Sequence, residues 1–129
     1  ELDVVVNIPA VKNGKWELIE NEIDSYTTAV KLKRNKVLKL ILETAYLNSK
    51  ELELLCNLCL KYNVDFAKTS TGYAPKGADV KDVLKMKKIL GESVQIKASG
   101  GIKSKKDAKE LIEAGATRLG TSSGIKLIK

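Results

Sequence analysis

The chain has no histidine, and among its 129 residues are only two cysteines, one tryptophan, one phenylalanine and four tyrosines. Without histidine and without a second pair of cysteines, the sequence lacks the ligands of a structural zinc site. Because aromatic residues are so few, it also lacks the stacking surface typical of a protein that binds single-stranded nucleic acid. No apolar run approaches the length that a membrane span needs. These absences argue against all three classes of protein.

The two cysteines, Cys56 and Cys59, lie within the apolar-periodic run 52–60. A spacing of three puts both thiols on one face of a helix. We therefore expect two buried core residues in a reducing, cytoplasmic compartment, and a redox or metal-binding pair is the less favoured interpretation. No signal peptide is visible, but the chain opens at Glu1 without a methionine. An upstream targeting segment therefore stays an open alternative.

Basic residues outnumber acidic ones by 23 to 16, which gives a formal net charge of +7. The lysines are spread along the predicted helices instead of forming one block, so solvated helix faces are the favoured interpretation. A basic surface also attracts an anionic, phosphorylated substrate. Nucleic-acid binding is the weakest hypothesis, because net charge is its only support, and it predicts an affinity that falls steeply with salt.

Apolar strand patterns and helical patterns alternate along the chain, at 43% apolar residues overall. Strands are expected at 2–8, 37–42, 64–69, 94–98 and 117–120, with helices between them and a last helix after 124. Such alternation indicates right-handed βαβ units and a parallel sheet in a single domain over 1–129. The closed version of this arrangement is the (β/α)8 barrel, with active sites at the C-terminal strand ends. The predicted fold class is therefore α/β, a partial TIM-type barrel of about five parallel strands.

Helix starts are predicted from capping residues. Three helical patterns are preceded by a residue whose side chain can accept a hydrogen bond from a free backbone N–H group. These residues are Asn48 or Ser49, Asp79, and Ser104. Pro9 is expected to end the first strand.

Lys68 and Lys97 end two consecutive strand patterns, and glycine-ended turns follow both. A single lysine at a strand end commonly keeps its ammonium in water, but two in equivalent positions indicate a site. A lysine that forms a Schiff base must be neutral when it attacks a carbonyl. On neighbouring strands roughly 5 Å apart, and at an effective dielectric near 20, two ammonium groups repel by about 3 kcal/mol, which lowers an amine pKa by about two. The pair therefore suits a nucleophilic amine beside a cationic one, with Asp3 as an inward acid.

Four other polar residues near the strand ends are weaker candidates. Lys39 and Glu43 share one face of the second strand pattern and are candidates to line the pocket, with ordinary strand-end charges as the alternative. Tyr46 and Tyr73 fall on the expected rim loops, where packing is the default interpretation.

Two turns have the composition of anion sites. The pair Gly100-Gly101 precedes the helix capped by Ser104, and Gly120-Thr121-Ser122-Ser123 opens the last helix. Backbone N–H groups at a helix N-terminus suit phosphate, and in (β/α)8 barrels the loops after strands seven and eight commonly bind it. A glycine pair alone is weak support, but two such turns beside a lysine pair predict a phosphate site.

Four segments resemble the deoxyribose-phosphate aldolase family, whose members are class I (Schiff-base) aldolases on a (β/α)8 barrel. They are Glu43-Thr44-Ala45-Tyr46-Leu47, Asp65-Phe66-Ala67-Lys68-Thr69-Ser70-Thr71-Gly72, Lys97-Ala98-Ser99-Gly100-Gly101-Ile102 and Gly115-Ala116-Thr117-Arg118-Leu119-Gly120-Thr121-Ser122-Ser123. The resemblance implies that Lys68 forms the Schiff base, that Lys97 depresses its pKa, and that Asp3 joins the proton relay. It also implies reversible cleavage of 2-deoxy-D-ribose 5-phosphate to acetaldehyde and D-glyceraldehyde 3-phosphate, with no metal or organic cofactor. The family's phosphate grip maps onto Gly72, Gly100, Gly101, Gly120, Ser122 and Ser123.

The resemblance runs almost from end to end of the chain, with Ala45 standing where the family usually has glycine. It covers roughly the second half of the family's chain, and the first strand here resembles the barrel's fourth. Five strands do not close an eight-stranded barrel, so we expect open edges at 2–8 and 117–120 that invite self-association. The alternative to an active aldolase is therefore an inactive half-barrel that binds phosphate or a partner chain. That partner is a second copy or a complementary N-terminal half.

Overall fold

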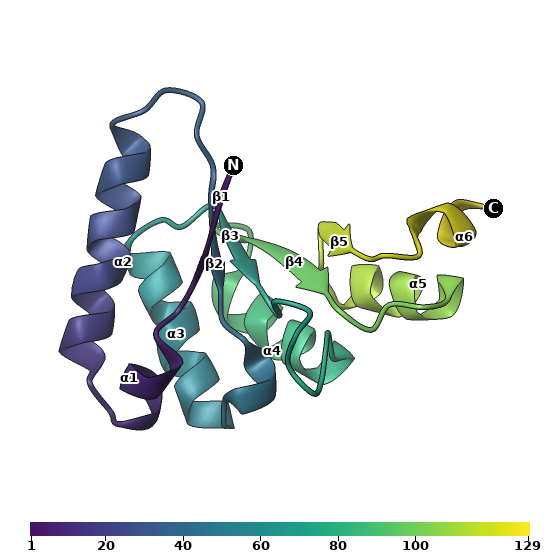
Figure 1. Cartoon of the computed structure of the whole chain (residues 1–129), viewed down its shortest axis with the longest axis horizontal. Coiled ribbons are helices and arrows are strands. Elements are labelled where there is room, and N and C mark those ends of the chain that lie inside the picture. The colour runs from purple at the N-terminus through teal and green to yellow at the C-terminus, as the bar shows by residue number, and fades with distance from the viewer.

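Five parallel strands form one sheet, and their order in space follows their order in the chain (Figure 1). The computed structural model describes residues 1–129. The strands are β1 (Leu2–Val5), β2 (Leu38–Ile41), β3 (Phe66–Lys68), β4 (Gln95–Ser99) and β5 (Arg118–Gly120). The helices are α1 (Ile8–Lys12), α2 (Trp16–Lys31), α3 (Ser49–Lys61), α4 (Val80–Leu90), α5 (Lys105–Ala114) and α6 (Gly124–Ile128), with a 3-10 turn, η1 (Thr44–Tyr46), after β2. The predicted α/β class is confirmed.

The sheet is open at both edges, because β1 pairs only with β2 and β5 pairs only with β4. This confirms the predicted partial (β/α) barrel with two unpaired strand edges. Each such edge exposes backbone N–H and C=O groups along one side.

The two faces of the sheet differ in character. Leu40, Ala67 and Ile96 are neighbours in register on β2, β3 and β4, and all three lie in the hydrophobic core that the helices complete. Because side chains alternate along a strand, the intervening residues face the other way, and these include Lys68 and Lys97. The helices therefore cover an apolar face and leave a charged face uncovered.

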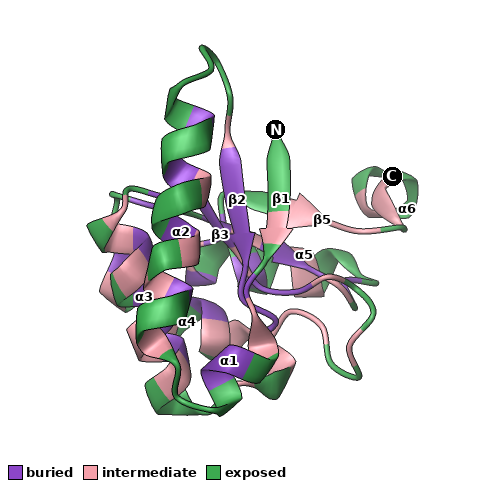
Figure 2. Cartoon of the chain, turned by 60° about the vertical axis from the view of Figure 1, so that its left-hand side comes forward, coloured by how far each residue is buried: buried purple, intermediate pink, exposed green.

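Strand β2 lies deepest in the sheet. All four of its residues are buried, whereas β1, at the edge, is mostly exposed (Figure 2). The exposed apolar side chains of β1 are Leu2 and Val5, with 48% and 44% of their surface accessible. An edge strand with accessible apolar side chains is a surface suited to contact with another chain.

The first strand is shorter than predicted, and a helix that the sequence did not predict follows it. Strand β1 ends at Val5, and α1 begins at Ile8. The Asn7 side chain caps this helix by accepting a hydrogen bond from the Ala10 N–H at 3.1 Å. Pro9 lies in the first turn, where the missing N–H of proline costs no hydrogen bond. Pro9 therefore starts a helix as well as excluding a longer strand.

The other helix starts agree with the predicted caps. Asn48 caps α3 and exchanges hydrogen bonds with Glu51, both at 2.8 Å. Ser104 and Asp107 form the same reciprocal capping box at α5. Asp79 caps α4 by accepting from the Lys81 N–H at 2.8 Å.

Both cysteines are fully buried in α3 as free thiols, which confirms their place in the core. Burial raises the pKa of the Cys56 thiol to about 12 and also raises that of Cys59. No group of three or more acidic, cysteine or histidine side chains is arranged to hold a metal ion. No helix combines the length and the apolar composition that crossing a bilayer requires.

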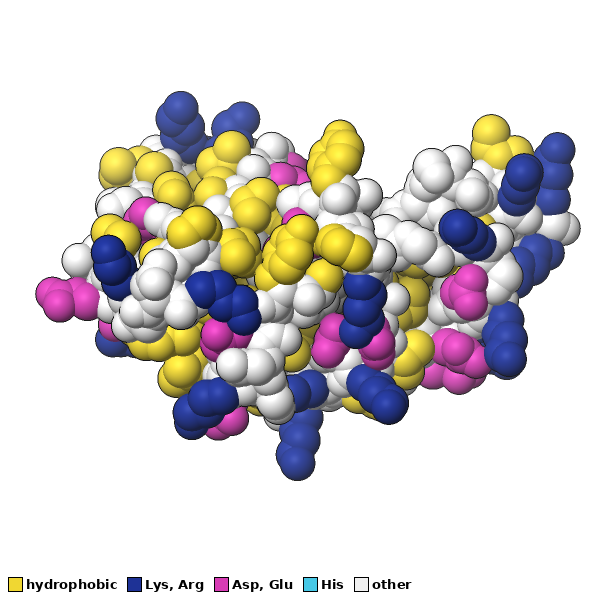
Figure 3. Space-filling model, turned by 60° about the horizontal axis from the view of Figure 1, so that its bottom comes forward, with side chains coloured by type: hydrophobic (Ala, Val, Ile, Leu, Met, Phe, Trp, Pro, Cys, Tyr) yellow, Lys and Arg dark blue, Asp and Glu magenta, His cyan; other side chains and the backbone are white.

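Lysine and arginine side chains are scattered over the surface, as expected. Figure 3 shows them interleaved with acidic and apolar side chains on one face of the molecule. Several pair with acids one turn away, such as Lys106 with Glu110 and Lys109 with Glu113 on α5.

Candidate active site

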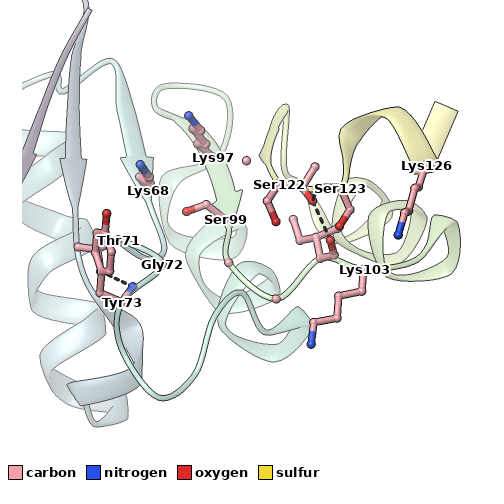
Figure 4. Close-up of a pocket in the computed structure, with 15 residues that line it drawn as sticks. Lys68, Thr71, Gly72, Tyr73, Lys97, Ser99, Lys103, Ser122, Ser123 and Lys126 are labelled. Carbon is pink, nitrogen blue, oxygen red and sulfur yellow. Dashed lines mark hydrogen bonds between the residues drawn. The ribbon is translucent and has the colours of Figure 1, made fainter.

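Lys68 is the last residue of β3, and Lys97 stands beside it in β4, two residues before the end of that strand. They are partners in the parallel register, so their side chains leave the same face of the sheet. Both line an open cleft with a volume of about 640 Å³ (Figure 4). The sequence-predicted lysine pair is therefore brought together at the rim of the sheet.

Asp3 reaches this pair from the edge strand β1. One carboxylate oxygen lies 3.2 Å from the Lys68 Nζ, and the other lies 3.1 Å from the Lys39 Nζ. Partial burial works against the charge of Asp3, but the hydrogen bonds from Lys39 and Lys68 outweigh it and lower the pKa of the carboxyl group. Asp3 touches Lys68 without lining the cleft itself.

Lys97 has a different electrostatic environment. No carboxylate lies within ion-pair distance of its ammonium, whereas Lys68 is held by Asp3. Burial lowers the pKa of Lys97, and the positive charges of Lys39 and Lys68 lower it further. Lys97 therefore gives up its proton more readily than an ordinary lysine. The sequence and the resemblance predict that Lys97 lowers the pKa of Lys68. The structure shows that the charge of Lys68 lowers the pKa of Lys97.

All six predicted phosphate-binding residues line the same cleft. They come from the turns after β3 and β4, from the last residue of β5 and from the turn after it, and they are Gly72, Gly100, Gly101, Gly120, Ser122 and Ser123. Figure 4 shows Ser122 and Ser123 across the cleft from Lys68. No carboxylate belongs to the cleft wall, so the wall suits an anion.

The turn after β4 depends on glycine for two separate reasons. Gly100 and Gly101 have φ angles of 83° and 73°, a region that side chains disfavour. A Cβ on the neighbouring Gly77 would lie 2.3 Å from the Gly100 carbonyl oxygen. The Ala78 N–H donates to that same oxygen at 3.0 Å. The loop after β3 is therefore packed directly on the turn after β4.

The backbone N–H groups of these turns are not equivalent. The Ser123 N–H donates to the Thr121 hydroxyl at 3.0 Å, so it already has a partner. The N–H groups of Gly101 and Ser122 donate to no backbone acceptor. Gly101 and Ser122 therefore present the free donors that an anion in the cleft needs.

Sequence reasoning missed several residues of the cleft wall. The lysines among them, Lys103 and Lys126, form no ion pair. The full additional set is Thr71, Ser99, Ile102, Lys103 and Lys126, and Thr121 lines the cleft as part of the predicted turn. Lys103 follows the glycine pair directly, so its proximity to that turn was available as a signal. Lys126 belongs to α6, and no local pattern indicates that this helix returns to the cleft.

The weaker candidates divide. Tyr73 lines the cleft mouth and is 96% exposed, whereas Tyr46 does not reach the cleft. Lys39 and Glu43 do not line it either, so the prediction that they line the pocket is wrong. The Lys39 ammonium is buried against Glu1, at 2.7 Å, and Asp3. The hydrogen bond that Lys39 donates to the Glu1 carboxylate is the main cause that raises the pKa of Lys39.

Glu43 lies behind the cleft wall. It is 4% exposed and has a φ angle of 54°. Thr44 and Ala45 begin the turn η1, and the φ angle of Ala45 is not positive. Alanine is therefore accommodated at position 45, and the left-handed conformation falls on Glu43 instead.

The chain is similar to curated deoxyribose-phosphate aldolases along its whole length, although no protein-family model matches it. It is 46% identical over 129 residues to the enzyme named so from Caldanaerobacter subterraneus subsp. tengcongensis, covering 100% of this chain and 56% of that protein. It is 48% identical over 128 residues to the one from Ureaplasma parvum serovar 3, covering 99% of this chain and 58% of that protein.

Solved structures give the same result. The aldolase QR15 superposes with a TM-score of 0.86 at 40% identity, over 97% of this chain and 55% of that one. The deoxyribose phosphate aldolase of Aeropyrum pernix, described as a unique tetramer, gives a TM-score of 0.81 at 32% identity, over 98% of this chain and 53% of that one.

These matches agree on the type of protein and on how much of each relative the chain covers. The chain spans a little more than half the length of its relatives and corresponds to their C-terminal half. Over that length, the chain is similar to the C-terminal half of deoxyribose-phosphate aldolases in both sequence and structure.

Proposed function

We propose that the cleft performs the reversible cleavage of 2-deoxy-D-ribose 5-phosphate to acetaldehyde and D-glyceraldehyde 3-phosphate through a lysine Schiff base. The observation that carries this proposal is the lysine pair, Lys68 and Lys97, in one cleft with three anion-suited turns. An amine that can be neutral and a phosphate site within the same cleft are what a Schiff-base reaction on a phosphorylated sugar requires.

Schiff-base formation needs an uncharged amine at Lys68. The Lys68 ammonium transfers a proton to the neighbouring Lys97. The lowered pKa of Lys97 favours its neutral amine, and only the neutral amine can accept that proton. The neutral Lys68 nitrogen then attacks the aldehyde carbon of the open-chain sugar. The carbinolamine that forms loses its hydroxyl group as water, with the proton that this needs coming from the charged lysine. The product is a protonated imine.

Carbon–carbon cleavage follows from that imine. A base removes the proton of the hydroxyl group on the third carbon, the bond between the second and third carbons breaks, and its electron pair moves to the imine nitrogen. D-Glyceraldehyde 3-phosphate leaves, and an enamine remains on Lys68. Protonation of the enamine carbon and addition of water then release acetaldehyde. The Asp3–Lys68–Lys97 cluster supplies and accepts protons in these steps.

The phosphate group anchors the other end of the substrate. Gly101 and Ser122 offer free N–H donors, and the ammonium groups of Lys103 and Lys126 line the same wall. Charge-assisted hydrogen bonds of this kind hold the dianion while leaving the aldehyde end near Lys68. Neither a metal ion nor an organic cofactor enters any step of the proposal.

Borohydride trapping tests the assignment. The chain is incubated with acetaldehyde and borohydride, and its peptides are analysed by mass spectrometry. We expect a reduced ethyl adduct on Lys68, absent in Lys68→Met and formed more slowly in Lys97→Met. An adduct on Lys97 alone would exchange the two roles, and a wild-type chain without any adduct would refute the Schiff-base proposal. Exposed Lys81→Met, on α4 and outside the cleft wall, is the matched control.

A second candidate function is an inactive half-barrel that binds phosphate and a partner chain. The open edges of β1 and β5 and the exposed Leu2 and Val5 favour it. The partner would be a second copy or a chain that supplies the complementary strands. Size-exclusion chromatography with an aldolase assay separates the two functions, since a monomer that turns over the substrate refutes the half-barrel. A dimer without turnover supports it.

A further inference from the structure

The structure buries one carboxylate that the proposed reaction does not use. Glu43 is only 4% exposed, and no lysine or arginine lies within ion-pair distance of it. Buried carboxylates are usually paired with a cation, because leaving water costs free energy. Its backbone is also in the left-handed region, with φ 54° and ψ 63°, which disfavours a residue of this size. Two costs at one residue point to a local role.

All hydrogen bonds of the Glu43 side chain go to one neighbour, Thr71. The Thr71 hydroxyl donates to Glu43 Oε2 at 2.5 Å, and the Thr71 N–H lies 3.3 Å from both carboxylate oxygens. Thr71 in turn lines the cleft, whereas Glu43 does not. Whatever Glu43 does to the reaction, it therefore does through Thr71.

The hydrogen bonds of Thr71 leave a single free position on its oxygen. A hydroxyl has one proton and two lone pairs. The proton is donated to Glu43, and one lone pair accepts the Tyr73 N–H at 3.1 Å. The remaining lone pair has no protein partner, and the residue forms the cleft wall on the side of Lys68 (Figure 4). Thr71 is thus held as an acceptor, and the negative charge behind it strengthens that role.

We infer that Glu43 is a positioning residue that fixes the Thr71 hydroxyl to accept a hydrogen bond from a hydroxyl group of the sugar during carbon–carbon cleavage. The inference rests on the proposed function, because it concerns the cleavage step that follows imine formation. Acetaldehyde has no hydroxyl group. Its imine on Lys68 should therefore form equally well with or without Glu43.

Trapping with two substrates tests this difference. With acetaldehyde, borohydride leaves a two-carbon adduct on the lysine. With 2-deoxy-D-ribose 5-phosphate, it leaves a five-carbon phosphorylated adduct before cleavage and the two-carbon adduct after it. The ratio of two-carbon to five-carbon adduct from the sugar reports cleavage separately from binding.

We expect Glu43→Gln and Thr71→Val each to lower that ratio roughly tenfold or more, with acetaldehyde adduct formation unchanged within about twofold. Thr71→Ser keeps the hydroxyl and should retain the wild-type ratio. The double variant should be no worse than the more impaired single one, because both changes break one unit. Glu43→Gly suits the left-handed backbone but lacks the carboxylate, so it should show the same loss as Glu43→Gln.

Three results would overturn the inference. An unchanged ratio of two-carbon to five-carbon adduct in Glu43→Gln would show that Glu43 has no role in cleavage. An equal loss of the acetaldehyde and sugar adducts would show that Glu43 only supports the structure. A wild-type chain that forms adducts but never the two-carbon adduct from the sugar also refutes it, while leaving the Schiff base intact. No adduct from either substrate refutes the proposed function itself, and this inference with it.

Discussion

Lys68 and Lys97 are register partners on the adjacent strands β3 and β4, yet only Lys68 contacts a carboxylate. Asp3 lies 3.2 Å from the Lys68 ammonium and reaches the sheet edge from β1. Two like charges on one face of a sheet repel, and a single acid beside one of them makes the pair unequal. The consequence is an asymmetric pair: Lys68 is held by a carboxylate, whereas burial and the charges of Lys39 and Lys68 lower the pKa of Lys97.

The first prediction concerns the pKa of Lys97. Lys68→Met removes one of the positive charges that lower it, so the pKa of Lys97 should rise toward the ordinary lysine value of 10.5. Titration of the lysine side chains by NMR measures the change. Exposed Lys81→Met should leave Lys97 as it is in the wild-type protein, and an equal response to both substitutions would contradict the electrostatic coupling.

Acid stability should depend on Asp3. Its pKa in the folded protein is below the reference value of 3.8, so its contribution to the free energy of unfolding is complete above that value. The contribution is lost as the pH falls through the lower, folded pKa. Asp3→Asn should therefore flatten part of the fall in stability below about pH 4, measured by urea unfolding. Asp24→Asn, at an exposed acid on α2 without an ion pair, should keep the wild-type slope.

Core packing gives a prediction that does not depend on function. Leu55 on α3 is 0% exposed, so Leu55→Ala should lower the free energy of unfolding by about 2–5 kcal/mol. Leu84 on α4 is 52% exposed, and Leu84→Ala should change it by less than about 1 kcal/mol. Similar midpoints in urea for both variants would mean that the α3 face is not in the core.

The contact between Gly77 and Gly100 should be essential for the cleft. A Cβ at position 77 would lie 2.3 Å from the Gly100 carbonyl oxygen, so Gly77→Ala must move the glycine turn and should cost about 1–3 kcal/mol of stability. It should also weaken the binding of inorganic phosphate, measured by titration calorimetry. Gly124→Ala is the control, because its Cβ would come no closer than 3.9 Å to a neighbouring atom, the Thr121 methyl group. Unchanged phosphate affinity in Gly77→Ala would show that the turn does not hold the anion.

Lys126 should add to phosphate affinity although it lies on the last helix. It lines the cleft and forms no ion pair, so Lys126→Met should weaken phosphate binding by about threefold to tenfold. The loss should shrink at high salt, because screening reduces the contribution of an exposed ammonium. Lys129→Met, at the end of the chain outside the cleft, should have no such effect. Equal losses in the two variants would indicate a general charge effect.

Local patterns in the sequence predicted most of the elements because their physical causes are local. Capping by Asn48 and Ser104 depends on residues three positions away, and apolar alternation depends on neighbours in the chain. The sequence did not predict α1, because a proline commonly marks the end of a strand. The place of Pro9 in the first turn of α1 depends on the cap that Asn7 provides.

The sequence by itself determined the five strands, the caps, and the presence of two lysines and two glycine-rich turns at strand ends, since each follows from spacing along the chain. Only the tertiary structure decided that Asp3 pairs with Lys68 and Lys39, that Lys126 returns to the cleft, and that Glu43 lies behind Thr71. These relations join residues tens of positions apart, and their distances depend on how strands and helices pack. Burial and charge at a site are sums over such neighbours in space, which spacing along the chain does not contain.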